Sequence, residues 1–90
     1  AQERSTNEIL MMAYSNKNSI EMTVKTKKAH FWSRSKKKLW FKGETSGNKL
    51  NIINIYTDCD SDALIYEVEL EGIGACHTGK KSCFYKKLEL

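Results

Sequence analysis

The sequence predicts a small single domain of the α+β class, rich in β-strands and with one short helix. Ninety residues suit one domain, and no proline, repeat or linker-like stretch divides them. Most apolar runs are β-branched or alternate with polar residues, which is typical of strands, and one segment combines an N-cap with helical spacing. Because so short a chain buries a small share of its surface, its core needs support from a metal or a second subunit.

The first elements predicted along the chain are a strand and the helix. The apolar run ILMMAY (Ile9–Tyr14) predicts a buried strand. Asn16 can accept hydrogen bonds from the first free amides of a helix, so a helix is expected from about Lys17 to Lys27. Ile20 and Val24 share one face of that helix.

The rest of the chain predicts strands joined by polar loops. AHFWS (29–33) has the composition of a strand, and the charged stretch RSKKKLWFKGETSGN (34–48) predicts a long surface loop around a short apolar centre. KLNIINIYT (49–57) and the alternating LIYEVEL (64–70) predict two strands that flank an acidic cluster. CFYKKLEL (83–90) can form a last strand.

Charge and cysteine content limit the classes of function. No apolar run approaches the roughly 20 residues that a membrane-spanning helix needs, so no membrane association is expected. The net charge of +4 and several lysine clusters suit a phosphate-bearing partner, although lysine runs are more often solvated surface. Three cysteines are an odd number for a disulfide framework, which favours a reducing, cytoplasmic location.

The acidic stretch DCDSDA has two explanations. In an extended segment Asp58, Asp60 and Asp62 would point to one side, while Cys59 and Ser61 point to the other. Three converging carboxylates repel one another, and a hard divalent cation such as Mg²⁺ offsets that repulsion. Aspartate and serine are also common in turns, so a polar hairpin turn explains the stretch equally well.

The cysteines form a second candidate metal site. Cys59, Cys76 and Cys83 offer soft thiolates that suit zinc, and three ligands leave a fourth tetrahedral position open, as in catalytic zinc sites. His77, next to Cys76, can complete the site or act as a base. The alternative is that the cysteines are buried as small hydrophobic residues, which is the commoner case.

The mixture of aromatic and basic residues in HFWSRSKKKLWF allows another function. Bases stack on aromatic side chains and lysines neutralise phosphates, so a small zinc-bearing nucleic-acid-binding module is the alternative function from a different class. Its signature would be an affinity for RNA or DNA that falls steeply with added salt. Against this, Phe31, Trp32 and Trp40 are more often core residues in so small a domain.

Taken in order, four motifs resemble the phosphoribosyl-AMP cyclohydrolase family, whose members open an adenine ring in histidine biosynthesis. The motifs are LMMAYSN, AHFWSRSKKKLWFKGETSGN, DCDSDA and GACHTGKKSCFY. The similarity runs from about Ile9 to Lys86, so residues 1–90 are interpreted as one cyclohydrolase domain. Ser61 stands where the family usually has glycine, and a backbone conformation that only glycine tolerates would be strained there.

The resemblance implies metal sites and an assembly. Zinc would be bound by Cys59 from one subunit and by Cys76 and Cys83 from its partner. Magnesium would be bound by the acidic cluster of Asp58, Asp60 and Asp62. The family forms an intertwined homodimer with active sites at the interface, and its members are often fused to a pyrophosphohydrolase.

The resemblance also implies a substrate, phosphoribosyl-AMP, and a hydrolytic reaction. Zinc-activated water would attack C6 of the N1-alkylated adenine ring and the C6–N1 bond would break, with His77 moving the proton. Two 5′-phosphates must be held, and the basic loop supplies donors for them. The substrate-binding candidates, with Trp40 either stacking or packing, are Arg34, Trp40, Lys42, Thr45, Ser46 and Gly47.

Overall fold

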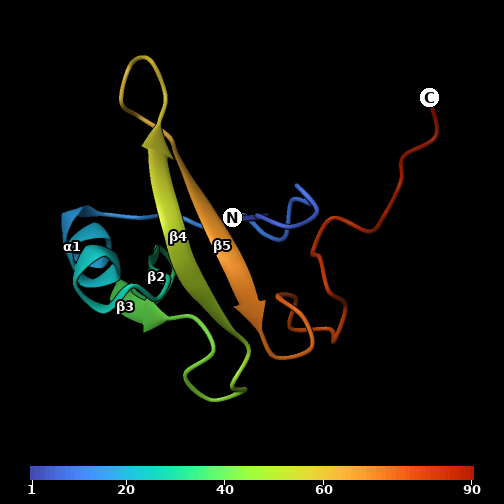
Figure 1. Cartoon of the computed structure of the whole chain (residues 1–90), viewed down its shortest axis with the longest axis horizontal. Helices are drawn as coiled ribbons and strands as arrows, with labels where there is room; N and C mark the ends of the chain where they lie inside the picture. The colour runs from blue at the N-terminus through green and yellow to red at the C-terminus, as the bar shows by residue number, and fades with distance from the viewer.

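A computed structural model describes residues 1–90 as two small sheets and one helix, which confirms the α+β class (Figure 1). A three-stranded sheet has the order β1-β5-β4, and β2 and β3 form a second sheet. The single helix is neither long nor apolar enough to cross a membrane. In chain order the elements are β1 (Gln2–Glu3), α1 (Lys17–Thr26), β2 (His30–Ser33), β3 (Lys38–Phe41), β4 (Lys49–Thr57) and β5 (Leu64–Glu71).

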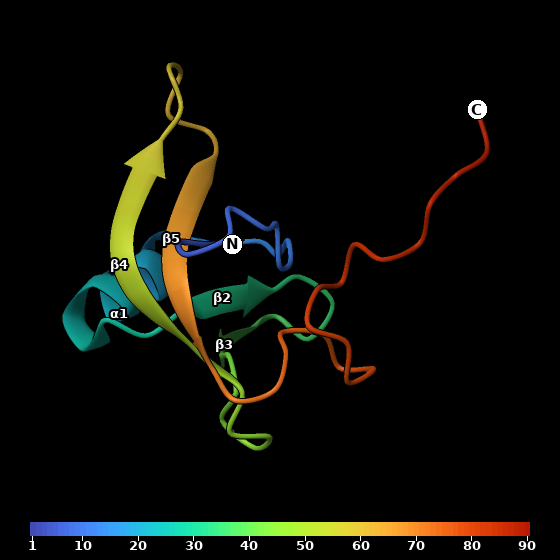
Figure 2. The ribbon, with the colours of Figure 1, turned by 45° about the vertical axis from the view of Figure 1, so that its right-hand side comes forward.

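The antiparallel pair β4–β5 is the longest feature of the fold and confirms the two strands predicted around the acidic cluster. Its register runs from Lys49 opposite Glu71 to Thr57 opposite Leu64, with an irregularity between Ile52 and Asn54. The hairpin carries its turn well beyond the rest of the molecule (Figures 1 and 2). The acidic turn therefore lies at the tip of a projecting arm.

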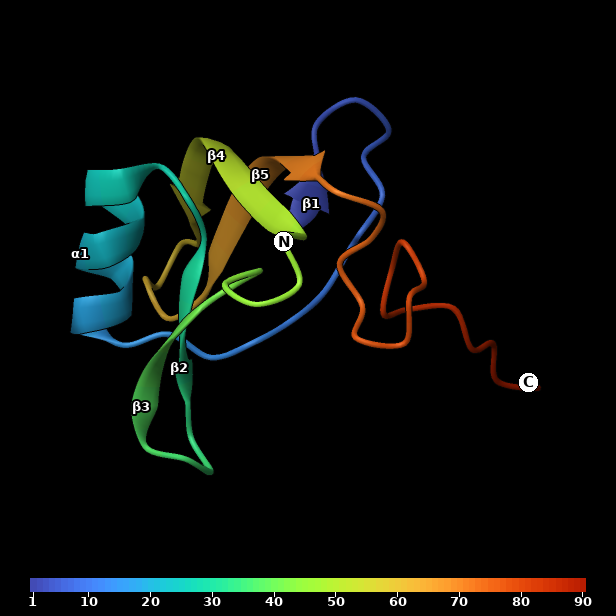
Figure 3. The same ribbon diagram turned by 90° about the horizontal axis from the view of Figure 1, so that it is seen from below.

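Helix α1 begins where the sequence predicts, but a different face is buried. Asn16 and Ser19 form a reciprocal capping box, and the helix ends before Lys27, which adopts a left-handed conformation. Ser19 and Thr23 are fully buried, whereas Val24 is 49% exposed. The buried face is polar because the Thr23 hydroxyl accepts a hydrogen bond of 2.9 Å from the amide of His30, which joins the helix to β2 (Figure 3).

The segment Ile9–Tyr14 does not form the predicted strand. Its contacts with neighbouring segments are isolated bridges, from Ile9 to Gln2 and from Tyr14 to Trp32. The backbone groups of this segment find partners on several different parts of the chain, so no continuous ladder forms. Leu10 and Met11 are buried, while the side chains around them are exposed.

The predicted long loop after residue 33 contains a strand. β3 pairs antiparallel with β2 from His30 opposite Phe41 to Ser33 opposite Lys38, and Lys37 supplies a left-handed residue to the turn. The apolar centre LWF of this stretch is therefore half of a hairpin. Its pairing with β2 could not be recognised from the charged residues on either side of it.

The C-terminal segment 83–90 does not form the predicted last strand. Beyond the amide of Cys83, no backbone-to-backbone hydrogen bond joins it to another segment, and it leads away from the sheets (Figure 1). The core lies between the β5 face and the β2–β3 hairpin, where Phe31 stacks on Tyr66 with ring centroids 5.6 Å apart. Its members are Leu10, Met11, Ala29, Phe31, Leu50, Tyr66, Val68 and Ala75.

Candidate active site

A cavity of about 660 Å³ lies along β3, between the loop that follows this strand and the loop that carries two of the cysteines. It brings together side chains from parts of the chain that are distant in sequence. Six of the residues predicted from sequence line it, and they are Trp40, Lys42, Thr45, Ser46, Cys76 and His77. The candidate zinc ligand Cys76 and the candidate base His77 therefore face the same space as the residues predicted to bind phosphate.

Gly43 and Asn48 shape one wall of this cavity. Gly43 has a φ of +84°, and a Cβ atom there would lie 2.5 Å from the carbonyl oxygen of Asn48. Any other residue would therefore meet both backbone strain and a clash. The Asn48 side chain in turn accepts a hydrogen bond of 3.1 Å from the amide of Ile73, which leads into the cysteine loop. The two walls of the cavity are thus directly connected.

Lys42 is the buried cation among those that line the cavity. Its residue is only 8% exposed, and no carboxylate lies within 4 Å of its ammonium group. The ammonium lies 6.0 Å from the ring centroid of Trp40, whose side chain is partly exposed. A mostly buried ammonium without an acidic partner attracts an anion, because burial strengthens its field.

Cys76 and Cys83 lie next to each other in one loop, which we call the cysteine loop (residues 74–83). The Thr78 hydroxyl, 3.0 Å from Cys76 Sγ, and the Thr78 amide lower the pKa of the Cys76 thiol. Burial and the adjacent Cys76 raise the pKa of the Cys83 thiol, and Lys42 partly offsets this. The first thiolate to form is therefore at Cys76, and a cation that binds both sulfurs must displace the Cys83 proton.

Cys59 is not part of this group within one chain. It is exposed in the turn at the tip of the β4–β5 hairpin, at the opposite end of the molecule from the cysteine loop (Figures 1 and 2). One chain therefore brings together two of the three candidate zinc ligands.

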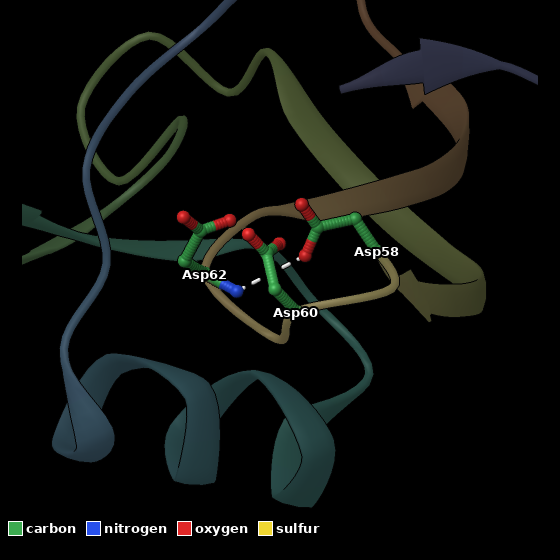
Figure 4. A group of neighbouring side chains, drawn as sticks. All are labelled: Asp58, Asp60 and Asp62. Carbon is green, nitrogen blue, oxygen red and sulfur yellow. Dashed lines mark hydrogen bonds between the residues drawn. The ribbon is translucent and has the colours of Figure 1, made fainter.

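The three aspartates of the same turn converge, as Figure 4 shows. One carboxylate oxygen from each of Asp58, Asp60 and Asp62 lies within 4.8 Å of the other two. Hydrogen bonding to the Ala63 amide is the main cause that lowers the pKa of Asp58, whereas Asp58 and then Asp60 raise the pKa of Asp62. The raised pKa of Asp62 is the behaviour of carboxylates that crowd one another, and the convergence of the three carboxylates suits a hard cation with oxygen ligands.

The same residues also build a turn, so the two explanations of the acidic cluster are compatible. Asp58 Oδ1 accepts hydrogen bonds from the amides of Asp62 at 3.0 Å and Ala63 at 3.1 Å. Ser61 has a φ of +59°, the left-handed conformation that costs a residue with a Cβ atom about 1–2 kcal/mol. The strain expected from serine in place of glycine is therefore present, and the strict alternation of an extended segment is not.

Arg34, Gly47 and His30 lie outside the main cavity. The Arg34 guanidinium lies 4.2 Å from the ring centroid of Tyr14, in a neighbouring groove of about 610 Å³. Ser33 and Trp40 line both spaces. The Gly47 amide donates to the Gly43 carbonyl at 2.9 Å within its own turn. His30 is buried, and its Nδ1 lies 2.9 Å from the carbonyl oxygen of Lys28.

The sequence did not single out Lys36 and Lys38 as binding candidates. Both line the main cavity, as does Glu44. The basic run as a whole suits a phosphate-bearing partner, but neither its spacing nor its composition separates these two lysines from solvated surface charge. The signal that could have found them is the β2–β3 hairpin, since its turn brings Lys36 and Lys38 to the edge of the cavity.

Comparisons with known proteins point to one family. A family model described as phosphoribosyl-AMP cyclohydrolase matches residues 11–85. A phosphoribosyl-AMP cyclohydrolase of Archaeoglobus fulgidus is 58% identical over 98% of this chain and 81% of its own length. A second, from Methanococcoides burtonii, is 49% identical over 99% of this chain and 73% of its own. A histidine biosynthesis bifunctional protein of Thermotoga maritima is 54% identical over 94% of this chain, which spans 44% of that protein.

Proposed function

The chain belongs to the phosphoribosyl-AMP cyclohydrolase family, and we propose that it hydrolyses the C6–N1 bond of the adenine ring in N1-(5-phosphoribosyl)-AMP. The product would be the formimino-carboxamide ribonucleotide of histidine biosynthesis. One observation carries this proposal: a single cavity is lined by Cys76 and His77 on one side and by Lys42, Thr45 and Ser46 on the other. Such a cavity can bind a phosphorylated substrate beside a group that moves protons.

The proposed enzyme is a homodimer whose active sites combine residues of both subunits. Cys59 of one subunit would join Cys76 and Cys83 of the other in a zinc site, since one chain keeps Cys59 far from that pair. The projecting hairpin also carries apolar side chains that are half exposed, Tyr56 at 53% and Ile65 at 48%, which lie opposite each other on neighbouring strands. Burial of this pair against a second copy would support the assembly.

The residues present suit both proposed metals. Thiolates at Cys76 and Cys83 are soft ligands that favour zinc, and the lowered pKa of Cys76 favours metal binding at neutral pH. Zinc held by these thiolates would lower the pKa of a water ligand to about 7 and so would supply hydroxide at neutral pH. The converging carboxylates of the hairpin tip are hard oxygen ligands and favour magnesium.

In the proposed reaction, one water molecule is added and one ring bond is broken. The water oxygen forms a bond to C6, and the electron pair of the C6–N1 double bond moves to the positively charged N1. Collapse of this adduct to a carboxamide breaks the remaining C6–N1 bond and leaves the exocyclic nitrogen in place. His77 is exposed in the cavity wall and would take a proton from the water and return one to N1.

The two phosphates of the substrate would be bound in different places. Lys36, Lys38 and Lys42 make the main cavity basic, and Thr45 and Ser46 add hydroxyl donors. Arg34 serves the neighbouring groove, where it has no carboxylate partner and its guanidinium is held against Tyr14. Trp40 lines both spaces, so the adenine ring can lie against it while the phosphates point apart.

Replacing Arg34 with glutamine should therefore raise KM for phosphoribosyl-AMP with little change in kcat. Loss of a charge-assisted hydrogen bond costs about 2 kcal/mol, or roughly thirtyfold in KM. Arg4→Gln is the matched control, because Arg4 lines neither space. AMP has a single phosphate, so its inhibition constant shows which substrate phosphate Arg34 binds. The substitution should change this constant only if Arg34 binds the phosphate that AMP also carries. An unchanged KM would remove Arg34 from the site.

Replacing Asp60 with asparagine should weaken Mg²⁺ binding by about tenfold, because the site loses one of three anionic ligands. Asp60 is chosen over Asp58 because Asp58 also accepts two backbone amides of the turn. Titration calorimetry measures the affinity, and Glu69→Gln, on exposed β5 surface, controls for loss of charge. An unchanged affinity would mean that these carboxylates only build the turn.

The proposed function is tested by following the ultraviolet change on ring opening with purified protein. Turnover of phosphoribosyl-AMP with zinc and magnesium present, and its loss on adding a chelator, is the expected result. No turnover by folded, zinc-loaded protein would contradict the proposal.

A further inference from the structure

Three consecutive residues at the end of the cysteine loop are attached to the N-terminal segment. The Lys81 ammonium lies 2.6 Å from Glu3 Oε1 and 3.2 Å from Glu8 Oε1. The Ser82 hydroxyl donates to the carbonyl of Ile9 at 2.6 Å. The amide of Cys83 donates to the carbonyl of Leu10 at 2.7 Å. None of these contacts is needed to form either sheet, so another role should explain them.

The two carboxylates that bind Lys81 are prearranged by a turn. The Glu3 amide donates to the Glu8 carbonyl at 2.8 Å, which brings the two residues together. The Thr6 hydroxyl donates to Glu3 Oε1 at 2.7 Å and orients that carboxylate. Two carboxylates this close repel each other unless a cation lies between them, and Lys81 supplies it. The side chain of Glu3 is only 12% exposed, so this network is screened less than an ordinary surface ion pair.

Ser82 fixes the backbone next to Cys83. It is 7% exposed, and its hydroxyl both donates to the Ile9 carbonyl and accepts from the Phe84 amide at 2.9 Å. One side chain thus satisfies groups on either side of the cysteine. Removing a buried hydroxyl that both donates and accepts a hydrogen bond is costly, because its two partners would be left unpaired.

The same attachment controls the position of Cys76. The Lys81 carbonyl accepts from the Ala75 amide at 2.9 Å, and the Lys80 carbonyl accepts from the Cys76 amide at 3.2 Å. Gly74 packs so closely on the Lys80 carbonyl that a Cβ atom would clash with it. A displacement of residues 80 and 81 would therefore move both sulfur atoms.

We propose that Lys81 and Ser82 are positioning residues, which hold Cys76 and Cys83 at a spacing that one zinc ion can bridge. The inference rests on the zinc role in the proposed function. It extends that role to Glu3 and Glu8, which lie far from the cysteines in sequence and touch neither of them. The contact between the cysteine loop and the turn at residues 3–8 is then part of the metal site.

The test compares zinc affinity, measured by competition with a chromophoric chelator, for the full chain and five variants. Lys81→Met, Glu3→Gln and Ser82→Ala should each weaken zinc binding by about tenfold, as supporting residues around metal ligands do. Lys80→Met is the matched control, because it removes the same charge from the same loop but contacts neither glutamate; its affinity should be unchanged. The double variant Glu3→Gln/Lys81→Met should be no weaker than Lys81→Met alone.

Hydrogen exchange without metal provides a second measurement. The Ala75 and Cys83 amides should lose protection in Lys81→Met, while the β4–β5 amides keep theirs, which separates loss of positioning from unfolding. Wild-type zinc affinity in Lys81→Met, or an equal loss in Lys80→Met, would overturn the proposal. If the wild-type chain bound no zinc, the proposed metal role would fail. In that case, unchanged protection of the Cys83 amide in Lys81→Met would overturn the positioning role as well.

Discussion

Replacement of Cys83 by serine is expected to remove zinc from the protein and to lower turnover by about a thousandfold or more. A serine hydroxyl stays protonated near neutral pH and is a poor zinc ligand, whereas a thiol loses its proton to the metal. Serine and cysteine have similar sizes, and Cys83 is exposed, so the fold should be preserved. The measurements are metal content after gel filtration and the rate of ring opening.

The thermal unfolding temperature of the metal-free variant is the control for this experiment. It should match that of the metal-free wild-type protein, because Cys83 holds its neighbours through a backbone amide, which serine retains. Full zinc content together with a wild-type rate would exclude Cys83 as a ligand. Lost activity with a much lower unfolding temperature would assign the effect to folding and would equally fail to support the zinc role.

Mixing two inactive variants is expected to restore activity if the active site is shared between subunits. In a dimer of Cys59→Ser with Cys83→Ser, one site would carry both substitutions and the other would carry neither. Random exchange of subunits between equal amounts would then recover about a quarter of the wild-type rate, because half of the dimers are mixed and each has one intact site. The prediction follows from the distance between the hairpin tip and the cysteine loop in one chain (Figure 1).

A matched mixture provides the control. Cys76 and Cys83 lie in the same loop, so a mixed dimer of Cys76→Ser with Cys83→Ser has no intact site and should stay inactive. Native mass spectrometry would establish that mixed dimers form in both experiments. If mixed dimers formed and neither pair recovered activity, each site would draw all of its cysteines from one chain, and the shared site would be wrong.

Local patterns determined much of this protein. The β4–β5 hairpin was predictable because β-branched and alternating residues on both sides of a polar turn specify two strands in sequence. The start of α1 was predictable because Asn16 and Ser19 satisfy its first amides locally. The motifs around the cysteines, aspartates and His77 indicated a hydrolase of one family, and the comparisons support that family.

Only the tertiary structure decided how distant segments meet. ILMMAY has the composition of a strand, but the Leu10 carbonyl accepts its hydrogen bond from the Cys83 amide. A strand needs one partner strand along its whole length, and this segment bonds to several parts of the chain instead. The buried helix face carries Thr23 because the amide of His30 lies against it. Arg34 and Lys36 are neighbours in a basic run, but they line different spaces.

The attachment of residues 81–83 to the N-terminal segment is the clearest such case. Nothing near Lys81 indicates that its partners are Glu3 and Glu8, because those contacts arise when the N-terminal segment, which pairs with β5, meets the end of the cysteine loop. A local sequence pattern records which conformation a segment prefers and which chemistry its side chains offer. It does not record which distant segment will supply their partners, because that depends on how the whole chain packs.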